Sequence, residues 1–346
     1  MKIRIITFSD RGERIAEKLC RTLMKSDDAD FMRCGETITL PEWTAESFGI
    51  SDALIFVGAC GIAVRAVAPF VESKASDPAV IVVDELGKYA IPILSGHLGG
   101  ANDLDRRVAG ILSAEAVITT ATDINGVFAI DEWARYQDCA VVGVDRIKDI
   151  SSRLLSGGLV SIKSNFPIMG ETPQGVVLVS DENADVHVTT RREPAGSSRG
   201  FASEKKEPLV IVPRIAVLGI GCRRGTEASS IEKCFEKAVS ELSIYDEAFY
   251  RVCSIDLKKN EPGLLEFCKA HELPFITYSS KELSRVPGEF SASGFVEEIT
   301  GVDNVCERSA VLGADDGRLV MKKLAWEGVT MAVAFSTVSL DWTWRG

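Results

Sequence analysis

The sequence has little that would place it in a membrane or tie it to a metal. No apolar run approaches the ~20 residues that a membrane-spanning helix needs. The start, from Met1 to Thr7, lacks the long apolar stretch and the small-residue cleavage site of a secretory signal. The nine cysteines include no Cys-x-x-Cys pair, which argues against zinc ribbons, iron–sulfur sites and disulfide frameworks. We therefore predict a cytoplasmic protein with no metal site of its own.

Positive charge and nucleotide-binding motifs are also scarce. The net charge of −11 argues against bulk nucleic-acid binding, which needs a basic face. No P-loop motif occurs, and Gly219-Ile220-Gly221 is followed by Gly225, a spacing that departs from the dinucleotide fingerprint. These absences disfavour a nicotinamide-dependent oxidoreductase but leave room for an acidic small substrate held by local arginines.

The length and the alternation of patterns predict the fold class. At 346 residues the chain is too long for one compact core, which indicates two or three domains. Apolar runs alternate with amphipathic stretches, so we expect two α/β/α sandwich-type domains with mainly parallel sheets. We place these domains at residues 1–139 and 209–346. A small middle region and a Ser/Gly-rich linker, together residues 140–208, would join them.

One glycine-rich turn carries the strongest chemical signal. Residues 89–94 predict a buried strand and residues 101–112 a helix, with Gly96-His97-Leu98-Gly99-Gly100 between them. A strand that feeds a helix start exposes backbone N–H groups, and glycine lets a ligand approach them closely. His97, one of only three histidines, either caps the helix or acts chemically, and this turn alone leaves both readings open.

Two further strand ends resemble this turn. Gly58 to Gly61 follow a predicted strand at 53–57, and Arg65 lies one turn into the next helix. Asp123 follows a predicted strand at 116–120. Ligands bind at the carboxyl ends of parallel strands, so we expect these groups to share one sheet edge with His97.

The C-terminal domain offers a cationic loop. A strand at 214–218 leads into Gly219 to Thr226, which places Arg223 and Arg224 at a helix start. Guanidinium pairs suit carboxylates or phosphates, although solvated arginines would look the same. Cys222 beside them would be biased toward thiolate if accessible, and otherwise is a buried thiol.

A second strand end in this domain adds two charged groups. Asp256 and Lys258 follow a predicted strand at 250–255. They belong either to the same ligand-binding edge or to a solvated turn.

Taken together and in order, these stretches resemble the CbiG family of cobalamin-biosynthesis proteins, the cobalt-precorrin-5A hydrolases of the anaerobic pathway. The resemblance covers nearly the whole chain, apart from the linker after Arg191 and the tail with Trp342 and Trp344. The motifs that carry it lie at residues 52–65, 94–102, 119–126, 219–226, 254–265 and 328–334.

The resemblance implies a reaction and a substrate. Water would open the δ-lactone of cobalt-precorrin-5A, and the extruded two-carbon bridge would leave as acetaldehyde to give cobalt-precorrin-5B. The cobalt belongs to the substrate, so no cofactor is expected. The partners would be this tetrapyrrole and possible neighbouring enzymes of the pathway, and the oligomeric state stays open.

Residue chemistry suggests a mechanism for this reaction. His97, whose ordinary pKa lies near neutrality, would activate water as a base. The N–H groups of Gly99 and Gly100 would hold the developing oxyanion. Asn102 would orient water or substrate, and Asp123 would hold the His97 tautomer or act as an acid.

The remaining candidates would bind the substrate. Arg65, Arg223 and Arg224 would clamp its acetate and propionate arms, in a cleft where the two α/β domains face each other. The other binding candidates are Gly61, Gly96, Cys222, Asp256 and Lys258. Two rivals stay open: covalent catalysis by Cys222, and a non-catalytic corrinoid binder that hands its ligand to a methyltransferase.

Overall fold

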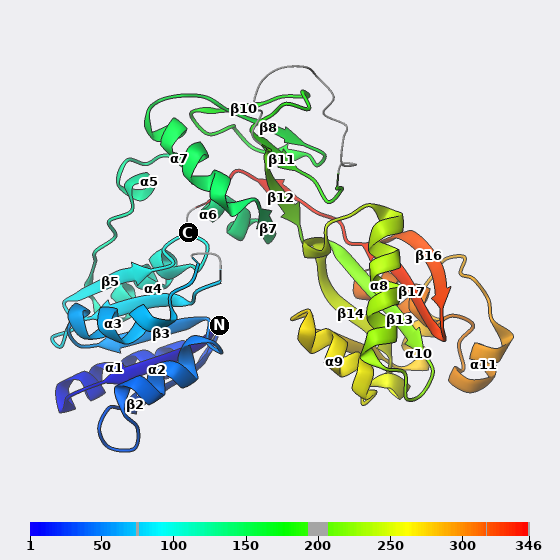
Figure 1. Cartoon of the computed structure of the whole chain (residues 1–346), viewed down its shortest axis with the longest axis horizontal. Coiled ribbons are helices and arrows are strands. Elements are labelled where there is room, and N and C mark those ends of the chain that lie inside the picture. The colour runs from blue at the N-terminus through cyan, green and yellow to red at the C-terminus, as the bar shows by residue number, and fades with distance from the viewer. Residues whose placement is uncertain (74–75, 193–206, 316, 345–346) are drawn as a thin grey trace. The chain divides into compact units, whose positions relative to one another are not determined.

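The computed structural model describes the chain except residues 74–75, 193–206, 316 and 345–346 (Figure 1). Most of the predicted linker therefore lies outside the described residues. The chain divides into two compact units, one of residues 1–136, 147–159 and 343–346 and one of residues 137–146 and 160–342. No helix among the described residues is both long and apolar enough to span a bilayer.

The first unit contains a six-stranded sheet in the order β2-β1-β3-β4-β5-β6. Its strands are β1 (Lys2–Thr7), β2 (Asp28–Arg33), β3 (Ala53–Val57), β4 (Ala79–Val83), β5 (Tyr89–Leu94) and β6 (Glu115–Ala116). Its helices are α1 (Asp10–Leu23), α2 (Leu40–Phe48), α3 (Cys60–Val67), η1 (Ala68–Phe70), α4 (Ala101–Leu112), α5 (Ala121–Ile124), α6 (Ile130–Tyr136) and α7 (Ile147–Leu155).

Helices cover both faces of this sheet because its central strands are apolar on both sides. Ile55 packs in one core with residues of α1 and α4. Phe56, the next residue, points to the opposite face and packs with residues of α2 and α3. The predicted α/β/α sandwich is thus present in this unit.

The direction of β5 differs from the sequence-based expectation. β4 and β5 are antiparallel, because only five residues connect them and a parallel pair needs a long crossover. The Asp84 carboxylate fastens this turn by accepting hydrogen bonds from the N–H groups of Lys88 and Tyr89, both at 2.7 Å. The carboxyl end of β5 therefore lies at the edge opposite that of β3. The three strand ends do not share one edge, and that prediction was wrong.

The second unit contains two five-stranded sheets, in the orders β10-β8-β11-β12-β7 and β15-β14-β13-β17-β16. The first is built from β7 (Cys139–Val142), β8 (Val160–Ser164), β10 (Val176–Leu178), β11 (Val186–Val188) and β12 (Leu209–Pro213). The second is built from β13 (Ala216–Cys222), β14 (Phe249–Ile255), β15 (Phe275–Tyr278), β16 (Arg318–Trp326) and β17 (Val329–Phe335). A short pair, β9 (Ile168–Met169) and β18 (Leu340–Asp341), completes the strands of its described part.

The second unit also contains α-helices and short 3₁₀ helices. They are η2 (Val144–Arg146), α8 (Ala228–Leu242), η3 (Asp246–Ala248), η4 (Asp256–Lys258), α9 (Pro262–Ala270), α10 (Ser280–Ser284), α11 (Gly294–Thr300) and α12 (Cys306–Gly313). We placed the start of the C-terminal domain at Leu209. The strand that begins there, β12, instead pairs with β11 and β7 in the first of the two sheets.

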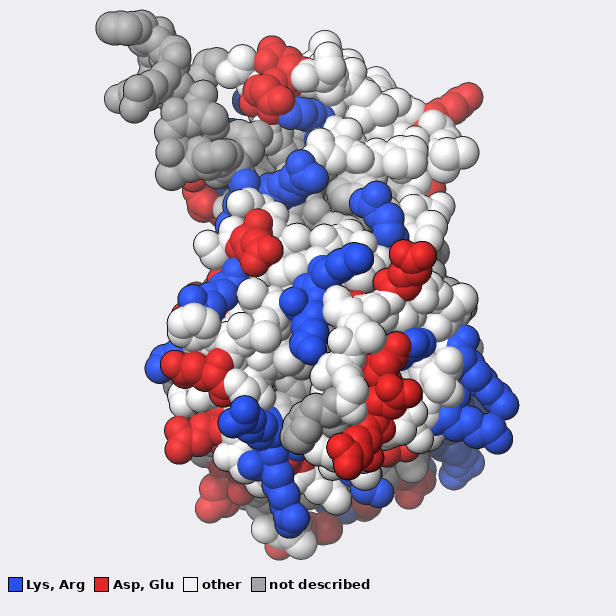
Figure 2. All heavy atoms as spheres, turned by 90° about the vertical axis from the view of Figure 1, so that its right-hand side faces the viewer, with Lys and Arg blue, Asp and Glu red and all other residues white. Residues whose placement is uncertain are grey.

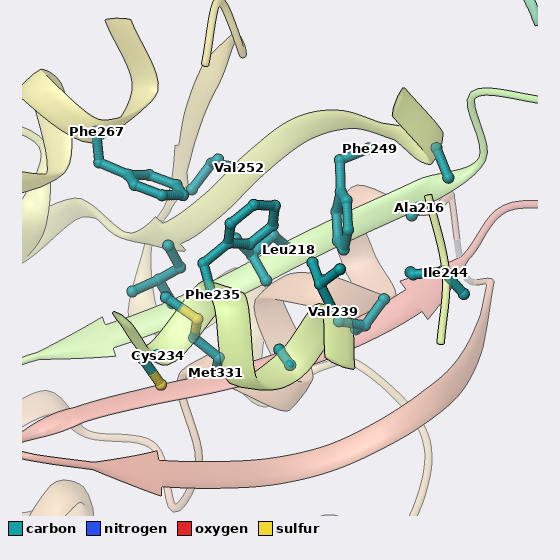
Figure 3. Close-up of a cluster of buried hydrophobic side chains, with 14 of the residues drawn as sticks. Ala216, Leu218, Cys234, Phe235, Val239, Ile244, Phe249, Val252, Phe267 and Met331 are labelled. Carbon is teal, nitrogen blue, oxygen red and sulfur yellow. The ribbon is translucent and has the colours of Figure 1, made fainter. Parts of the chain in front are cut away.

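The sheet that contains β13 is again covered on both faces. Leu218 packs with Phe235 of α8 and Phe267 of α9, in the core shown in Figure 3. Its neighbour Val217 faces the other way and packs with Ala310 of α12. Alternation along β13 therefore gives a second α/β/α sandwich, as predicted.

The tryptophans of the tail pack within the protein. Trp344 meets Phe128 of the first unit in a T-shaped contact with ring centroids 5.1 Å apart. Trp342, the last residue of the second unit, is buried as well.

Candidate active site and binding cleft

The turn after β5 is wound tightly enough to need its glycines. Gly100 has φ of 77°, and its N–H donates to the His97 carbonyl at 2.9 Å. A Cβ on Gly99 would fall 2.4 Å from Cβ of Ser95, so no larger residue fits there. The Gly100 N–H is thus not available for an oxyanion, contrary to our expectation. No described residue accepts a hydrogen bond from the Gly99 N–H.

His97 lies between two carboxylates. Its Nε2 is 3.0 Å from Oδ2 of Asp123, and its Nδ1 is 3.2 Å from Oδ1 of Asp131. The side chains of His97, Asp123 and Asp131 are 12%, 8% and 5% exposed, so solvent screens these contacts little. Asp123 reaches the ring from the short helix α5, because the strand expected at 116–120 ends at Ala116.

This arrangement changes the acid–base character of His97. Burial alone would lower the pKa of the imidazole, but the hydrogen bonds to Asp131 and Asp123 and the charges of Asp131 and Glu132 raise it to about 9. His97 is therefore an imidazolium at neutral pH, with both ring nitrogens occupied by carboxylates. That state makes it a proton donor, whereas we had expected a base.

A chain of alternating charges extends from Asp123. Asn102 Nδ2 donates to its Oδ2 at 3.0 Å, and Arg106 donates to its Oδ1 at 2.7 Å. Arg106 also binds Asp103, which in turn pairs with Arg135. Burial would raise the pKa of Asp123, but the hydrogen bonds from His97 and Arg106 hold it below its ordinary value. The structure thus brings His97, Asn102 and Asp123 together in a buried network.

Four members of this network were not identified from the sequence. Asp103 and Arg106 are three residues apart on α4, so their spacing was a usable signal for an ion pair. Asp131 and Arg135 lie on α6, and no local pattern indicates that this helix approaches His97.

Three side chains of the site also have the geometry to hold a cation. Ligand atoms of His97, Asp123 and Glu132 lie within 4.8 Å of one another. In the present arrangement both ring nitrogens of His97 are hydrogen-bonded to carboxylates, Nε2 to Asp123 and Nδ1 to Asp131.

Gly61 and Arg65 lie apart from this network, at the other edge of the sheet. The Arg65 guanidinium donates to the Gly61 carbonyl of its own helix at 3.0 Å. The antiparallel β5 therefore separates them from His97, and the structure does not support a shared site.

The second unit contains a large cleft at the carboxyl ends of β13 and β14. Its volume is about 1260 Å³, which suits a ligand of macrocycle size. Cys222, Arg223, Arg224 and Lys258 line it, as the sequence suggested, whereas Asp256 does not.

A buried carboxylate organises the arginine turn of this cleft. Oε1 of Glu261 accepts the Gly225 N–H at 2.6 Å, and its Oε2 accepts Lys258 Nζ at 3.0 Å. Glu261 is only 7% exposed, so the ammonium of Lys258 balances a buried charge. This pairing, which the sequence did not reveal, holds the loop that carries Arg223 and Arg224.

Cys222 does not have the properties of a nucleophile. Burial raises the pKa of its thiol above the ordinary value, and the charge of Lys258 only partly opposes this. The expected bias toward thiolate is therefore reversed, which disfavours covalent catalysis by Cys222.

Charges on the surface are mixed in sign where Figure 2 shows them. Groups of lysines and arginines lie beside groups of aspartates and glutamates on that face.

Comparisons with known proteins extend over both units. Residues 42–123 match the family described as Cobalamin synthesis G N-terminal, and residues 216–334 match Cobalamin synthesis G C-terminus. A cobalt-precorrin-5A hydrolase from Salmonella typhimurium is 35% identical over 298 residues, which cover 83% of each chain. One from Priestia megaterium is 32% identical over 95% of this chain and 94% of its own.

A solved structure also matches along the chain. A cobalamin biosynthesis protein G homologue from Sulfolobus solfataricus covers 97% of both chains at 21% identity, with a TM-score of 0.41. The sequence matches by themselves, over both units and in order, establish the relationship. The chain belongs to the CbiG family of cobalamin synthesis proteins.

Proposed function

We propose that the chain is a cobalt-precorrin-5A hydrolase of cobalamin biosynthesis. The observation that carries this is 35% identity to an enzyme of that name over 83% of both chains. Water and cobalt-precorrin-5A are consumed, and acetaldehyde and cobalt-precorrin-5B are formed.

The chemistry of this reaction needs a proton donor. Water adds to the lactone carbonyl, the acyl C–O bond breaks, and a carboxyl group forms. Acetaldehyde can leave only when its carbon–carbon bond to the macrocycle breaks. The electron pair of that bond stays on the macrocycle carbon, which must then take a proton.

His97 is suited to supply that proton. Its imidazolium is held by Asp131 and Asp123, and the nearby Gly99 N–H supports the oxyanion formed during water attack. Asn102, which donates to Asp123, keeps that carboxylate in place. In this proposal the first unit carries the proton chemistry.

The second unit supplies substrate binding in its cleft. Arg223 and Arg224 would bind carboxylate arms of the tetrapyrrole, which gives an acidic protein a locally cationic site. The cobalt arrives with the substrate, so the reaction needs no cofactor from the protein.

We also propose a cytoplasmic location, since all nine cysteines are free, as in reducing compartments. Nucleic acid would not be a partner. Other enzymes of the pathway are expected as partners, and self-association would be compatible with this function.

The test is acetaldehyde release from cobalt-precorrin-5A by the purified protein. We expect His97→Asn to lower kcat by about 100-fold or more, because general acid catalysis contributes on that order. His271→Gln, which changes a histidine at the end of α9, serves as the control and should turn over like the wild type. Substrate binding without acetaldehyde release would instead indicate the corrinoid carrier.

The pH profile separates an acid from a base. If His97 donates a proton, kcat falls as pH rises through about 9, the raised pKa of its imidazole. Asp131→Asn removes one carboxylate from Nδ1 and should move this fall to lower pH. A rate that rises through the same range would assign His97 as the base.

A further inference from the structure

We propose that Lys323 binds a carboxylate arm of the tetrapyrrole in the cleft that Arg223 and Arg224 also line. The identity of the ligand rests on the proposed function. The role of the lysine rests on its position, its anchoring and the charges around it.

Lys323 has a fixed place in the cleft wall. It lies on β16, and its N–H donates to Oε1 of Glu307 at 2.7 Å. Glu307 is fully buried and also accepts the N–H of Ser291 at 2.8 Å. The buried carboxylate therefore fixes the backbone of Lys323 and leaves its long side chain to reach into the cleft.

The positive charge of Lys323 has no described carboxylate partner. The same holds for Arg223 and Arg224 among the described residues, although these three cations line one cleft. Their potential partners are engaged elsewhere: Glu261 pairs with Lys258, and Asp303 pairs with Arg308.

The remaining acidic residue of the lining is Glu327, which is exposed. Three unpaired cations thus face a single free carboxylate. An anionic ligand would remove this imbalance.

The spacing of these cations favours a ligand with several carboxylates. Lys323 lies on β16, whereas Arg223 and Arg224 follow the end of β13, and β17 separates these two strands, which therefore lie roughly 10 Å apart. The lining also includes apolar and aromatic side chains, among them Val305, Ala325 and Trp326. An apolar ring with acidic arms matches a lining that combines apolar side chains and cations.

The experiment measures binding of uroporphyrin, an acidic tetrapyrrole without the lactone, to the full-length protein by fluorescence quenching. Lys323→Gln should weaken binding about tenfold, because it removes a charge-assisted hydrogen bond to a carboxylate arm. Binding by Lys323→Gln should also depend less steeply on salt concentration than binding by the wild type. Lys323→Arg should restore most of the affinity. Lys322→Gln is the matched control, since it removes the same charge from the neighbouring exposed residue outside the cleft.

The outcomes separate this inference from the proposed function. If Lys323→Gln and Lys322→Gln bind alike, the role of Lys323 is refuted, even where the wild type releases acetaldehyde. If only Lys323→Gln weakens binding and the wild type releases no acetaldehyde, the cleft assignment stands and the hydrolase assignment fails. With the natural substrate, Lys323→Gln should raise KM and leave kcat nearly unchanged, because the residue would bind the substrate equally in the ground state and the transition state.

Discussion

At the scale of single residues, surroundings reverse two expectations from ordinary chemistry. His97 would titrate near neutrality in water, yet two carboxylates raise its pKa to about 9. Cys222 lies beside arginines, yet burial raises the pKa of its thiol. In both cases the groups in contact with the side chain decide its protonation, and those groups come from other parts of the chain.

The raised pKa of His97 predicts a pH-dependent stability. The folded pKa of about 9 lies above the ordinary 6.5, so the protonated ring stabilises the fold fully below pH 6.5. This contribution, on the order of 3 kcal/mol, is lost as pH rises through about 9. Denaturant unfolding from pH 6 to 10 should show this loss in the wild type and not in His97→Gln.

Comparing the wild type with His97→Gln cancels the effect of every group that titrates in both proteins. Burial raises the pKa of Asp105 on α4 to about 7, and this carboxyl group titrates in both proteins. Only the difference between them reports on His97. Parallel stability curves for the two proteins would contradict the assignment of an imidazolium.

At the scale of elements, the close approach of a helix to a strand explains Gly219, a residue whose spacing to other glycines resembles a nucleotide-binding motif. A Cβ on Gly219 would lie 1.9 Å from the carbonyl oxygen of Cys306 and 2.8 Å from N of Ala310. Strand β13 therefore meets helix α12 backbone to backbone at this residue. The glycine serves helix packing, and a bound pyrophosphate is not needed to explain it.

A pair of alanine substitutions tests this reading of the glycines. Gly219→Ala should lower the free energy of unfolding by about 3 kcal/mol or more, because backbone atoms must move to accept the methyl group. Gly110→Ala, within α4 and with open space around its Cβ, should instead raise it by ~0.5–1 kcal/mol. Urea unfolding measures both, and equal effects of the two substitutions would refute the packing argument.

At the scale of the whole molecule, the chain holds separate hydrophobic cores. Ile5, Ile55 and Leu104 belong to a core of the first unit, whereas Leu218 and Phe235 belong to a core of the second. Each core is built within its own compact unit. Units with their own cores can unfold separately.

Calorimetry should therefore resolve two thermal transitions. We expect His97→Gln to lower the Tm of one transition, because it removes the cation that the buried Asp131 carboxylate contacts in the first unit. Gly219→Ala should lower the other, since its clash lies in the second unit. The double variant should combine the two shifts, whereas one transition that responds to both changes would show a single cooperative unit.

The sequence by itself determined the alternation of strands and helices, the two α/β/α sandwiches and the glycine-rich turns. It also indicated His97, Asn102 and Asp123, which the structure joins by hydrogen bonds. These features are legible because periodicity and turn chemistry are local, and each depends on residues close along the chain.

Only the tertiary structure decided which distant groups meet. Asp131 reaches His97 across 34 positions, and Glu307 fixes the backbone of Lys323 from a different element. The direction of β5 placed Arg65 at the opposite edge from His97, although a five-residue turn was already visible. Local patterns carry no information on the contacts of Asp131 and Glu307, and these contacts determine the charge on His97 and the place of Lys323 in the cleft.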